Sequence, residues 1–488
     1  MSGDRRVTAA AASVARAVRS AATPSPYDAL MTARQAPYRC TACQADALRW
    51  AGQCSTCGAW NSLEEVVAEQ ETAAVLIPQA LGAIDRGATT PVPTGVTEVD
   101  RVLAGGLVPG SVTLVAGAPG IGKSTLCLQA AVVAAARGEV ALIVAAEESA
   151  PQVAGRAARL GAPATGIEVL ATASLPDALA AMLTTAASVV VVDSISTMAD
   201  PMIKSPSGGV AQVRAAAERL AHIAHARGIA LILVGHVTKE GDLAGPRALE
   251  HLVDTVMHIE GDRHHERRVV STTKHRFGPA GEVGLLTMDA DGFRSVADPS
   301  AALMAERGPA LPGSVATVLA EGARPLVVEI QALVTPAVAS PARVAQSVSA
   351  TRLRQLAAVL DAHGGLDLGR HDLFVACSGA VRATEPSVDL AVVAALVSAY
   401  QDVALDPRVL CLGEVGLTGA IRPPSSGGRR LAEAARVGLD WAVVPPGVEI
   451  PPGVRAIEVT TVRDLLGAIE RLSIRRRMPA PDRSGQPF

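Results

Sequence analysis

Short apolar runs alternate with longer segments of helical periodicity through the middle of this 488-residue chain. The run at 189–192 is four consecutive valines followed by an acid, as in a strand that is buried on both faces of a parallel sheet. Similar strands are expected at 111–116, 140–146, 167–170 and 229–234, with helices at 126–137, before 160, from 176, and at 210–227. The alternation predicts an α/β domain over 93–298, with a parallel sheet covered by helices on both faces. Three further β-like stretches, at 255–260, 267–274 and 282–288, are expected to close the sheet as hairpins.

A second α/β pattern occupies 313–474, after a segment rich in Pro and Ala at 299–312 that is expected to be a hinge. Its expected strands are 315–320, 327–333, 373–377 and 442–444, and its expected helices are 352–362, 387–399, 429–437 and 462–471. We interpret 1–36 as a disordered tail, or as translated from a start upstream of Met31, and a transit peptide is the alternative. We interpret 67–92 as a linker and 475–488 as a disordered basic tail.

The composition is that of a chain with an ample hydrophobic core and no membrane span, since hydrophobic residues make up 49% and every long apolar run is interrupted. The net charge of −3 gives no sign of nucleic-acid binding, so any such surface must be local. With only three Trp, three Tyr and four Phe, base stacking on an aromatic platform is disfavoured. Lysine is scarce, and the four that occur are candidates for sites that need an ammonium: Lys123, Lys204, Lys239 and Lys274.

Four of the seven cysteines form two C-x-x-C pairs within 37–66, namely Cys40, Cys43, Cys54 and Cys57. Two such pairs can bring four thiolates to one tetrahedral Zn²⁺, so we expect a small zinc finger, with redox disulfides as the alternative. The finger could bind DNA or protein, or only stabilise the chain. The remaining cysteines are scattered in apolar contexts, which suits a reducing cytoplasm.

A phosphate-binding loop joins the first strand of the central domain to its first helix. It fits G-x-x-x-x-G-K-[ST] and consists of Gly117, Ala118, Pro119, Gly120, Ile121, Gly122, Lys123, Ser124 and Thr125. Backbone N–H groups and the helix N-terminus would surround a phosphate chain. Lys123 would reach the phosphates of ATP, and Ser124 would hold Mg²⁺; the alternative is a Gly-rich turn with a chance lysine.

Other residues supply the remaining parts of ATP hydrolysis, which needs a metal ligand, a group that activates water, and positive charge for the transition state. Asp193 ends a buried strand and would hold Mg²⁺, or simply cap the strand. Glu147 is favoured over Glu148 as the group that activates water, and His236 would sense the γ-phosphate or lie in a surface loop.

Lys274 and Arg276 alternate along an expected strand, so both side chains would face one way. Such a pair of cations could complete a neighbouring subunit's site, and a solvated basic strand is the alternative.

These residues together carry a resemblance. The segments 94–125, 147–149, 192–194, 235–241, 245–247 and 274–278, with the four-cysteine module and Trp60-Asn61, resemble the RadA (Sms) family of bacterial DNA repair proteins. The resemblance implies a RecA-like ATPase core with ATP, Mg²⁺ and Zn²⁺. It also implies a DNA-dependent ATPase that drives branch migration with the RecA recombinase on single-stranded and branched DNA, as a hexamer. The family signature usually reads Lys-Asn-Arg-Phe-Gly, whereas His275 stands here in place of Asn.

Residues 385–389, 413–419 and 426–436 resemble the Lon protease domain, with Ser387 at the nucleophile position. A Ser–Lys dyad needs a lysine, and none follows Lys274; we align Gly428 with the lysine position, beside Arg429 and Arg430. We therefore expect no proteolysis. An ATP-dependent protease and a signalling ATPase without motor activity are the alternative functions. Candidate DNA-contacting residues are the loop 204–209 with Arg214, the loop 239–247, and the arginines near the ends of the domains.

Overall fold

The computed structural model describes residues 38–47, 49–65, 80, 89–163, 165–236, 248–261, 266–321, 324–338 and 340–474. The chain divides into two compact units between residues 84 and 85. The expected tails at 1–36 and 475–488, and most of the expected linker at 67–92, lie outside the described residues.

The first unit contains a three-stranded antiparallel sheet in the order β2-β1-β3. Its strands are β1 (Tyr38–Cys40), β2 (Asp46–Ala47) and β3 (Leu63–Glu65). Among the described residues of this unit, the buried apolar side chains are Cys40, Cys54 and Leu63, so the apolar core is small. A module with so little core needs a further stabilising element, such as a bound metal.

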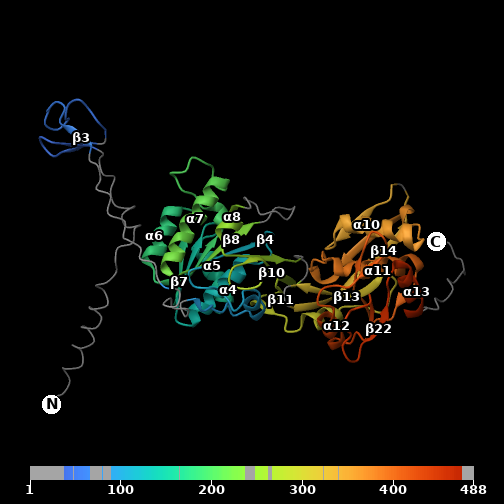
Figure 1. The fold of residues 1–488 in the computed structure, drawn as a ribbon. Helices are drawn as coiled ribbons and strands as arrows, with labels where there is room; N and C mark the ends of the chain where they lie inside the picture. Colours follow the sequence, from blue (N-terminus) through green and yellow to red (C-terminus); the bar gives the residue numbers. More distant parts are fainter. Residues whose placement is uncertain are drawn as a thin grey trace, which may run out of the picture. The chain divides into compact units, whose positions relative to one another are not determined.

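The second unit begins with a nine-stranded sheet in the order β12-β11-β10-β9-β4-β8-β7-β5-β6. Figure 1 labels β4, β7, β8, β10 and β11 of this sheet. The strands are β4 (Val112–Gly117), β5 (Val140–Ala145), β6 (Ile167–Ala171), β7 (Ala187–Asp193), β8 (Ala230–His236), β9 (Thr255–Glu260), β10 (Arg267–His275), β11 (Val283–Asp289) and β12 (Gly292–Ser295). The helices are α3 (Thr97–Val102), α4 (Lys123–Ala136), α5 (Ala150–Arg159), α6 (Leu175–Thr184), η3 (Ile195–Thr197), α7 (Val210–Arg227) and α8 (Ala248–Leu252).

The six strands from β9 to β6 in this order are parallel, and their carboxyl ends therefore lie at one edge of the sheet. One apolar cluster joins the sheet to α4 and α5, and a second joins it to α6 and α7, so helices cover both faces. The expectation for 255–260 was wrong in one respect. This strand, β9, runs parallel to β4 and extends the parallel sheet, and the antiparallel hairpins begin only at β10.

A second, seven-stranded sheet has the order β15-β16-β14-β13-β18-β21-β22. Its strands are β13 (Ser314–Glu321), β14 (Arg324–Pro336), β15 (Arg343–Gln346), β16 (His371–Cys377), β18 (Val409–Cys411), β21 (Trp441–Val444) and β22 (Arg455–Glu458). Two small pairs accompany it, β17 (Ala404–Leu405) with β23 (Ser473–Ile474), and β19 (Glu414–Val415) with β20 (Ile421–Arg422).

Helix α11 (Asp389–Gln401) is buried against this second sheet over most of its length. The other helical segments are α9 (Pro299–Ala305), α10 (Ala350–Val359), η4 (Leu360–Gly364), η5 (Leu368–Arg370), η6 (Ser378–Ala380), η7 (Pro386–Val388), α12 (Gly427–Arg436) and α13 (Val462–Leu472). The segment expected as a hinge therefore starts with a helix, α9, which packs on β14.

Ion pairs connect the two sheets of this unit. Arg324 at the start of β14 bonds Glu98 in α3, at 3.0 Å, and Arg382 after β16 bonds Glu260 at the end of β9, at 2.8 Å. Glu98 is 6% exposed, so the first of these pairs is largely shielded from solvent. The contacts attach the second α/β domain to α3 and to the end of β9 in the first.

Candidate active site and metal centre

The phosphate-binding loop lies between β4 and α4, and the helix begins at Lys123 rather than at the expected residue 126. Gly120 and Gly122 have positive φ angles of 76° and 112°, which favour glycine. A Cβ at residue 122 would lie 2.5 Å from the ring of Phe293. Backbone conformation therefore requires glycine at residues 120 and 122, and close packing against Phe293 also requires it at residue 122.

Lys123 is only 4% exposed, and its Nζ donates to the carbonyl oxygens of Gly117 at 2.9 Å and Ala118 at 3.1 Å. Burial lowers its pKa, whereas the negative charges of Asp193 and Glu147 act in the opposite direction. An ammonium held at the loop in this way can donate to phosphate oxygens seated in it.

Ser124 and Asp193, the two expected magnesium ligands, contact each other because the Ser124 hydroxyl donates to the Asp193 carboxylate. Burial raises the pKa of Asp193, and this hydrogen bond opposes the rise. Hydroxyl and carboxylate oxygens are ligands that Mg²⁺ prefers, so the residues present fit a magnesium ion beside the loop.

Glu147 and Glu148 follow β5 and have different partners. The Ser194 hydroxyl, fully buried at the end of β7, donates to Glu147. Glu148 instead pairs with Arg156 of α5. Glu147 is therefore the carboxylate turned toward the strand ends next to Asp193, and Glu148 is held by a cation on a neighbouring helix.

His236 ends β8, where its backbone is in register with Gly117 at the end of β4. Its position is at the same sheet edge as the phosphate loop, whereas its side chain lies outside the described residues. The same holds for the loop 239–247. Lys204 of the loop 204–209 is exposed, and Arg214 pairs with Glu218.

Lys274 and Arg276 lie at the edge of the sheet opposite to the edge that carries the phosphate loop. His275 between them is in register with Thr255, which in turn is in register with Thr113 near the start of β4. The phosphate loop follows the other end of β4. Neither cation can therefore reach the phosphate loop of its own chain.

The two cations differ in their surroundings. Lys274 Nζ donates to the carbonyl oxygens of Glu250 at 2.6 Å and Val253 at 2.7 Å, at the end of α8. Arg276 bonds the buried Asp254 at 2.9 Å, yet 58% of its side chain is exposed. Arg276 is thus the more available of the two to a molecule outside the chain.

His275 replaces the family's asparagine without introducing a charge. Its Nδ1 lies 2.9 Å from the Thr255 hydroxyl. Burial lowers the pKa of His275, so the ring is neutral at pH 7 and can exchange a hydrogen bond with Thr255 as an amide would.

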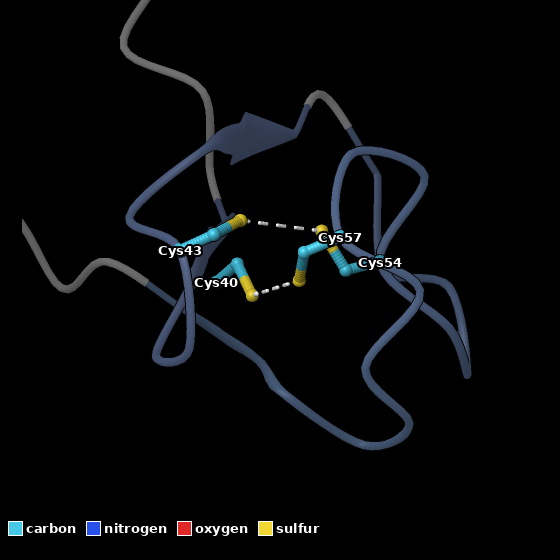
Figure 2. A group of neighbouring side chains, drawn as sticks. All are labelled: Cys40, Cys43, Cys54 and Cys57. Carbon is cyan, nitrogen blue, oxygen red and sulfur yellow. Dashed lines mark hydrogen bonds between the residues drawn. The ribbon is translucent and has the colours of Figure 1, made fainter.

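The four cysteines of the first unit come together as expected of zinc ligands (Figure 2). Their Sγ atoms all lie within 4.8 Å of one another, with Cys40 and Cys57 at 3.7 Å and Cys43 and Cys54 at 3.8 Å. A tetrahedron of Zn–S bonds has S···S edges of about 3.8 Å, whereas a disulfide is about 2.0 Å long. The distances fit Zn²⁺ and exclude disulfides between these four residues.

Replacing Cys54 with serine is expected to remove zinc and unfold residues 38–65, because so small a core cannot hold the module by itself. Residues 89–474 belong to a separate unit and should keep their amide protection. Zinc content and hydrogen exchange by mass spectrometry measure both effects, with Cys377→Ala as the control that keeps zinc. Undiminished protection of 38–65 without metal would contradict a structural role for the ion.

Ser387, at the nucleophile position of the Lon resemblance, contacts an arginine. The side chain of Arg430 is buried, and its NH1 donates to Ser387 Oγ at 3.0 Å. The same guanidinium pairs with Glu385 at 2.7 Å. Arg430, and not Gly428, is therefore the residue that lies beside the serine. Arginine stays protonated and cannot accept the serine's proton.

Arg268 of β10 is a residue of this site that no sequence pattern indicates. It is 5% exposed, and its Nε donates to the carbonyl oxygen of Ile121 in the phosphate loop, at 3.2 Å. Arg268 belongs to no motif. Its contact with the loop arises from the packing of β10 beside the loop and can be identified only in the folded structure.

Among the residues that the structure describes, no helix is both long enough and apolar enough to span a bilayer.

Comparison with known proteins agrees with this geometry. Residues 93–242 match a family described as an AAA domain, and residues 38–65 match a rubredoxin metal binding domain. The fold is a RecA-like P-loop α/β core with an N-terminal zinc ribbon. A solved structure of the RadB recombinase matches 42% of this chain and 98% of its own, at 22% identity. Its TM-score of 0.35 is too low to carry an argument.

Curated relatives match over nearly their whole length. The DNA repair protein RadA of Mycolicibacterium smegmatis is 42% identical over 90% of this chain and 97% of its own. The proteins of the same name from Pseudomonas aeruginosa and Escherichia coli are 42% and 41% identical, over 88% and 89% of this chain and 98% of each relative. Identity at this level and coverage shows that the chain belongs to the RadA family of DNA repair proteins.

Proposed function

We propose that this protein is a DNA-dependent ATPase that processes recombination intermediates in the cytoplasm and uses ATP hydrolysis to promote branch migration of RecA-mediated strand exchange. The observation that carries the proposal is the convergence of the phosphate loop, the Ser124–Asp193 pair and Glu147 at one sheet edge. The relatives bear the name DNA repair protein, which supports DNA as the partner.

Each residue has a role in hydrolysis that follows from its position. Lys123 donates to the phosphate oxygens, and Ser124 with Asp193 hold Mg²⁺, which neutralises charge on the phosphates when bound. Glu147 orients a water molecule and accepts its proton, for which a carboxylate beside the γ-phosphate is suited. Ser194 fixes the carboxylate by donating to it.

We propose that Arg276, with Lys274, completes the site of a neighbouring subunit in a ring of identical chains, of which a hexamer is the expected form. Each chain carries the phosphate loop at one edge of its sheet and these cations at the other. A head-to-tail contact between copies brings the two edges together, and such contacts form a ring when the rotation from copy to copy closes.

A loop between η3 and α7 is the proposed DNA contact within the described residues. Lys204 and Met202 are exposed there, and the buried Gln212 amide donates to the carbonyls of Asp200, Ile203 and Ser205 at 3.0 to 3.1 Å. An exposed cation on a loop held in shape can contact phosphates without reading sequence.

The proposal is tested by the rate of ATP hydrolysis with and without single-stranded or branched DNA. We expect stimulation by both DNAs that weakens as salt is raised, because phosphate contacts release counterions. A rate that no DNA changes, with no DNA binding in any nucleotide state, would instead favour a signalling ATPase without motor activity.

Proteolysis is the second candidate, and the contact between Arg430 and Ser387 disfavours it. We expect no casein degradation with ATP and Mg²⁺ present. Degradation that Ser387→Ala abolishes would reverse this conclusion.

A further inference from the structure

Arg268 holds the phosphate loop from the side of the sheet. The residue lies near the start of β10, and its side chain is almost fully buried. Its Nε donates to the carbonyl oxygen of Ile121 at 3.2 Å. Ile121 itself is 1% exposed, so this hydrogen bond is made away from water. A hydrogen bond from a cation in such surroundings fixes geometry more strongly than one at a surface.

The direction of the Ile121 carbonyl determines the direction of the next N–H group. The carbonyl of Ile121 and the N–H of Gly122 belong to one planar trans peptide, so they point to opposite sides. Arg268 draws the oxygen toward β10. The Gly122 N–H is thereby turned away from β10, and the loop presents a donor to phosphate rather than an oxygen that would repel it.

The surroundings leave the peptide little freedom to rotate. At Gly122, the Phe293 ring of β12 occupies the space that a Cβ would need. Phe293 is tied to α4 by two bonds between its backbone and the Gln129 amide, at 2.8 and 3.1 Å. Arg268 also donates from NH1 to the carbonyl of Arg267 at 2.7 Å, which fixes the guanidinium. The loop is therefore held by contacts with residues of both β10 and β12.

We propose that Arg268 is a positioning residue for nucleotide binding. It sets the Ile121–Gly122 peptide so that the Gly122 N–H donates to the phosphate chain of a nucleoside di- or triphosphate. The proposal rests on the proposed ATPase function only in that the loop binds nucleotide. It adds an arginine outside the loop motif and outside the signature at 274–278.

Replacing Arg268 with glutamine is the first test, with binding of N-methylanthraniloyl-ADP and Mg²⁺ measured by fluorescence. Losing one well-placed donor is expected to raise Kd about tenfold. The N–H acts on bound nucleotide before and during reaction, so KM for ATP should rise with kcat nearly unchanged. A residue that only stabilised the fold would lower the active fraction, and hence kcat, without raising KM.

Arg268→Lys is the second test, because lysine places a methylene where Nε stands and cannot donate from that position. It should raise KM by a smaller factor while keeping the positive charge. Arg307→Gln is the matched control. Arg307 is a buried arginine paired with Glu329 in the second α/β domain, and its loss should lower the melting temperature without changing Kd.

The outcomes distinguish a failure of the Arg268 proposal from a failure of the ATPase proposal. An unchanged Kd and KM in Arg268→Gln, or in Arg268→Lys if the glutamine variant does not fold, overturns the role of Arg268. A wild-type protein that binds the labelled ADP but does not hydrolyse ATP defeats the ATPase proposal and leaves the Arg268 inference standing.

Discussion

Replacing Glu147 with glutamine is expected to lower kcat for ATP hydrolysis by about 10²- to 10⁴-fold, the range for a lost general base. Glutamine keeps the size of the side chain and can still bond the Ser194 hydroxyl, so the loop and its nucleotide affinity should be unchanged. A steady-state ATPase assay gives kcat, and binding of labelled ADP confirms that affinity is retained.

Glu148→Gln is the matched control, because it changes the adjacent carboxylate in the same way. Glu148 is held in an ion pair with Arg156, which is about one-third exposed on the carboxylate side. Breaking such a pair costs little, so kcat should stay within about twofold of the wild type. A control that loses activity while Glu147→Gln keeps it would assign the base to Glu148 instead.

Most strands of the central sheet could be predicted from the sequence, because a strand that is buried on both faces has a short continuous run of apolar residues. The valines before Asp193 are an example, and the structure has them in β7. The direction of β9 was not predictable in this way. An apolar strand has the same pattern whether its neighbour is parallel or antiparallel.

The site could be predicted where a motif fixes local geometry and not where distant segments meet. The loop 117–125 carries its own glycine pattern, and the four cysteines carry their own spacing. Arg430 meets Ser387 across 43 positions, and Arg268 meets Ile121 across 147. No periodicity connects such pairs, so only the packed fold identifies these arginines. The short strands β15, β18 and β22 were not predicted for a related reason. Three or four residues are too few to show an alternation of apolar and polar positions.

The proposed neighbour-completed site predicts that two inactive variants recover activity when mixed. Lys123→Ala removes the phosphate-loop cation, and Arg276→Gln removes the trans-acting cation. Glutamine can still donate to Asp254, and Arg276 is largely exposed, so this variant should fold. Each variant by itself is expected to be nearly inactive in ATP hydrolysis with DNA, because every contact between copies then lacks one of the two cations.

An equal mixture contains some intact sites, formed where the loop of an Arg276→Gln chain meets Arg276 of a Lys123→Ala chain. With random exchange in a head-to-tail ring, half of the chains have an intact phosphate loop and the other half have an intact Arg276. Both parts are then intact at about a quarter of the contacts between chains, so about a quarter of the sites should work. Activity of the mixture is then about a quarter of the wild-type rate at equal total protein. If the cation acted within its own chain, no chain in the mixture would have both groups, and the rate would stay at that of the inactive variants.

Exchange between rings needs its own measurement, since unmixed rings would also give no recovery. Energy transfer between wild-type chains labelled with donor and acceptor dyes, mixed as separate preparations, supplies it. If energy transfer shows that chains exchange while the two single variants fail to recover activity, Arg276 lies outside the neighbouring site. The sheet geometry would then have to be explained by a structural role, in which Arg276 serves only to pair with the buried Asp254 at the start of β9.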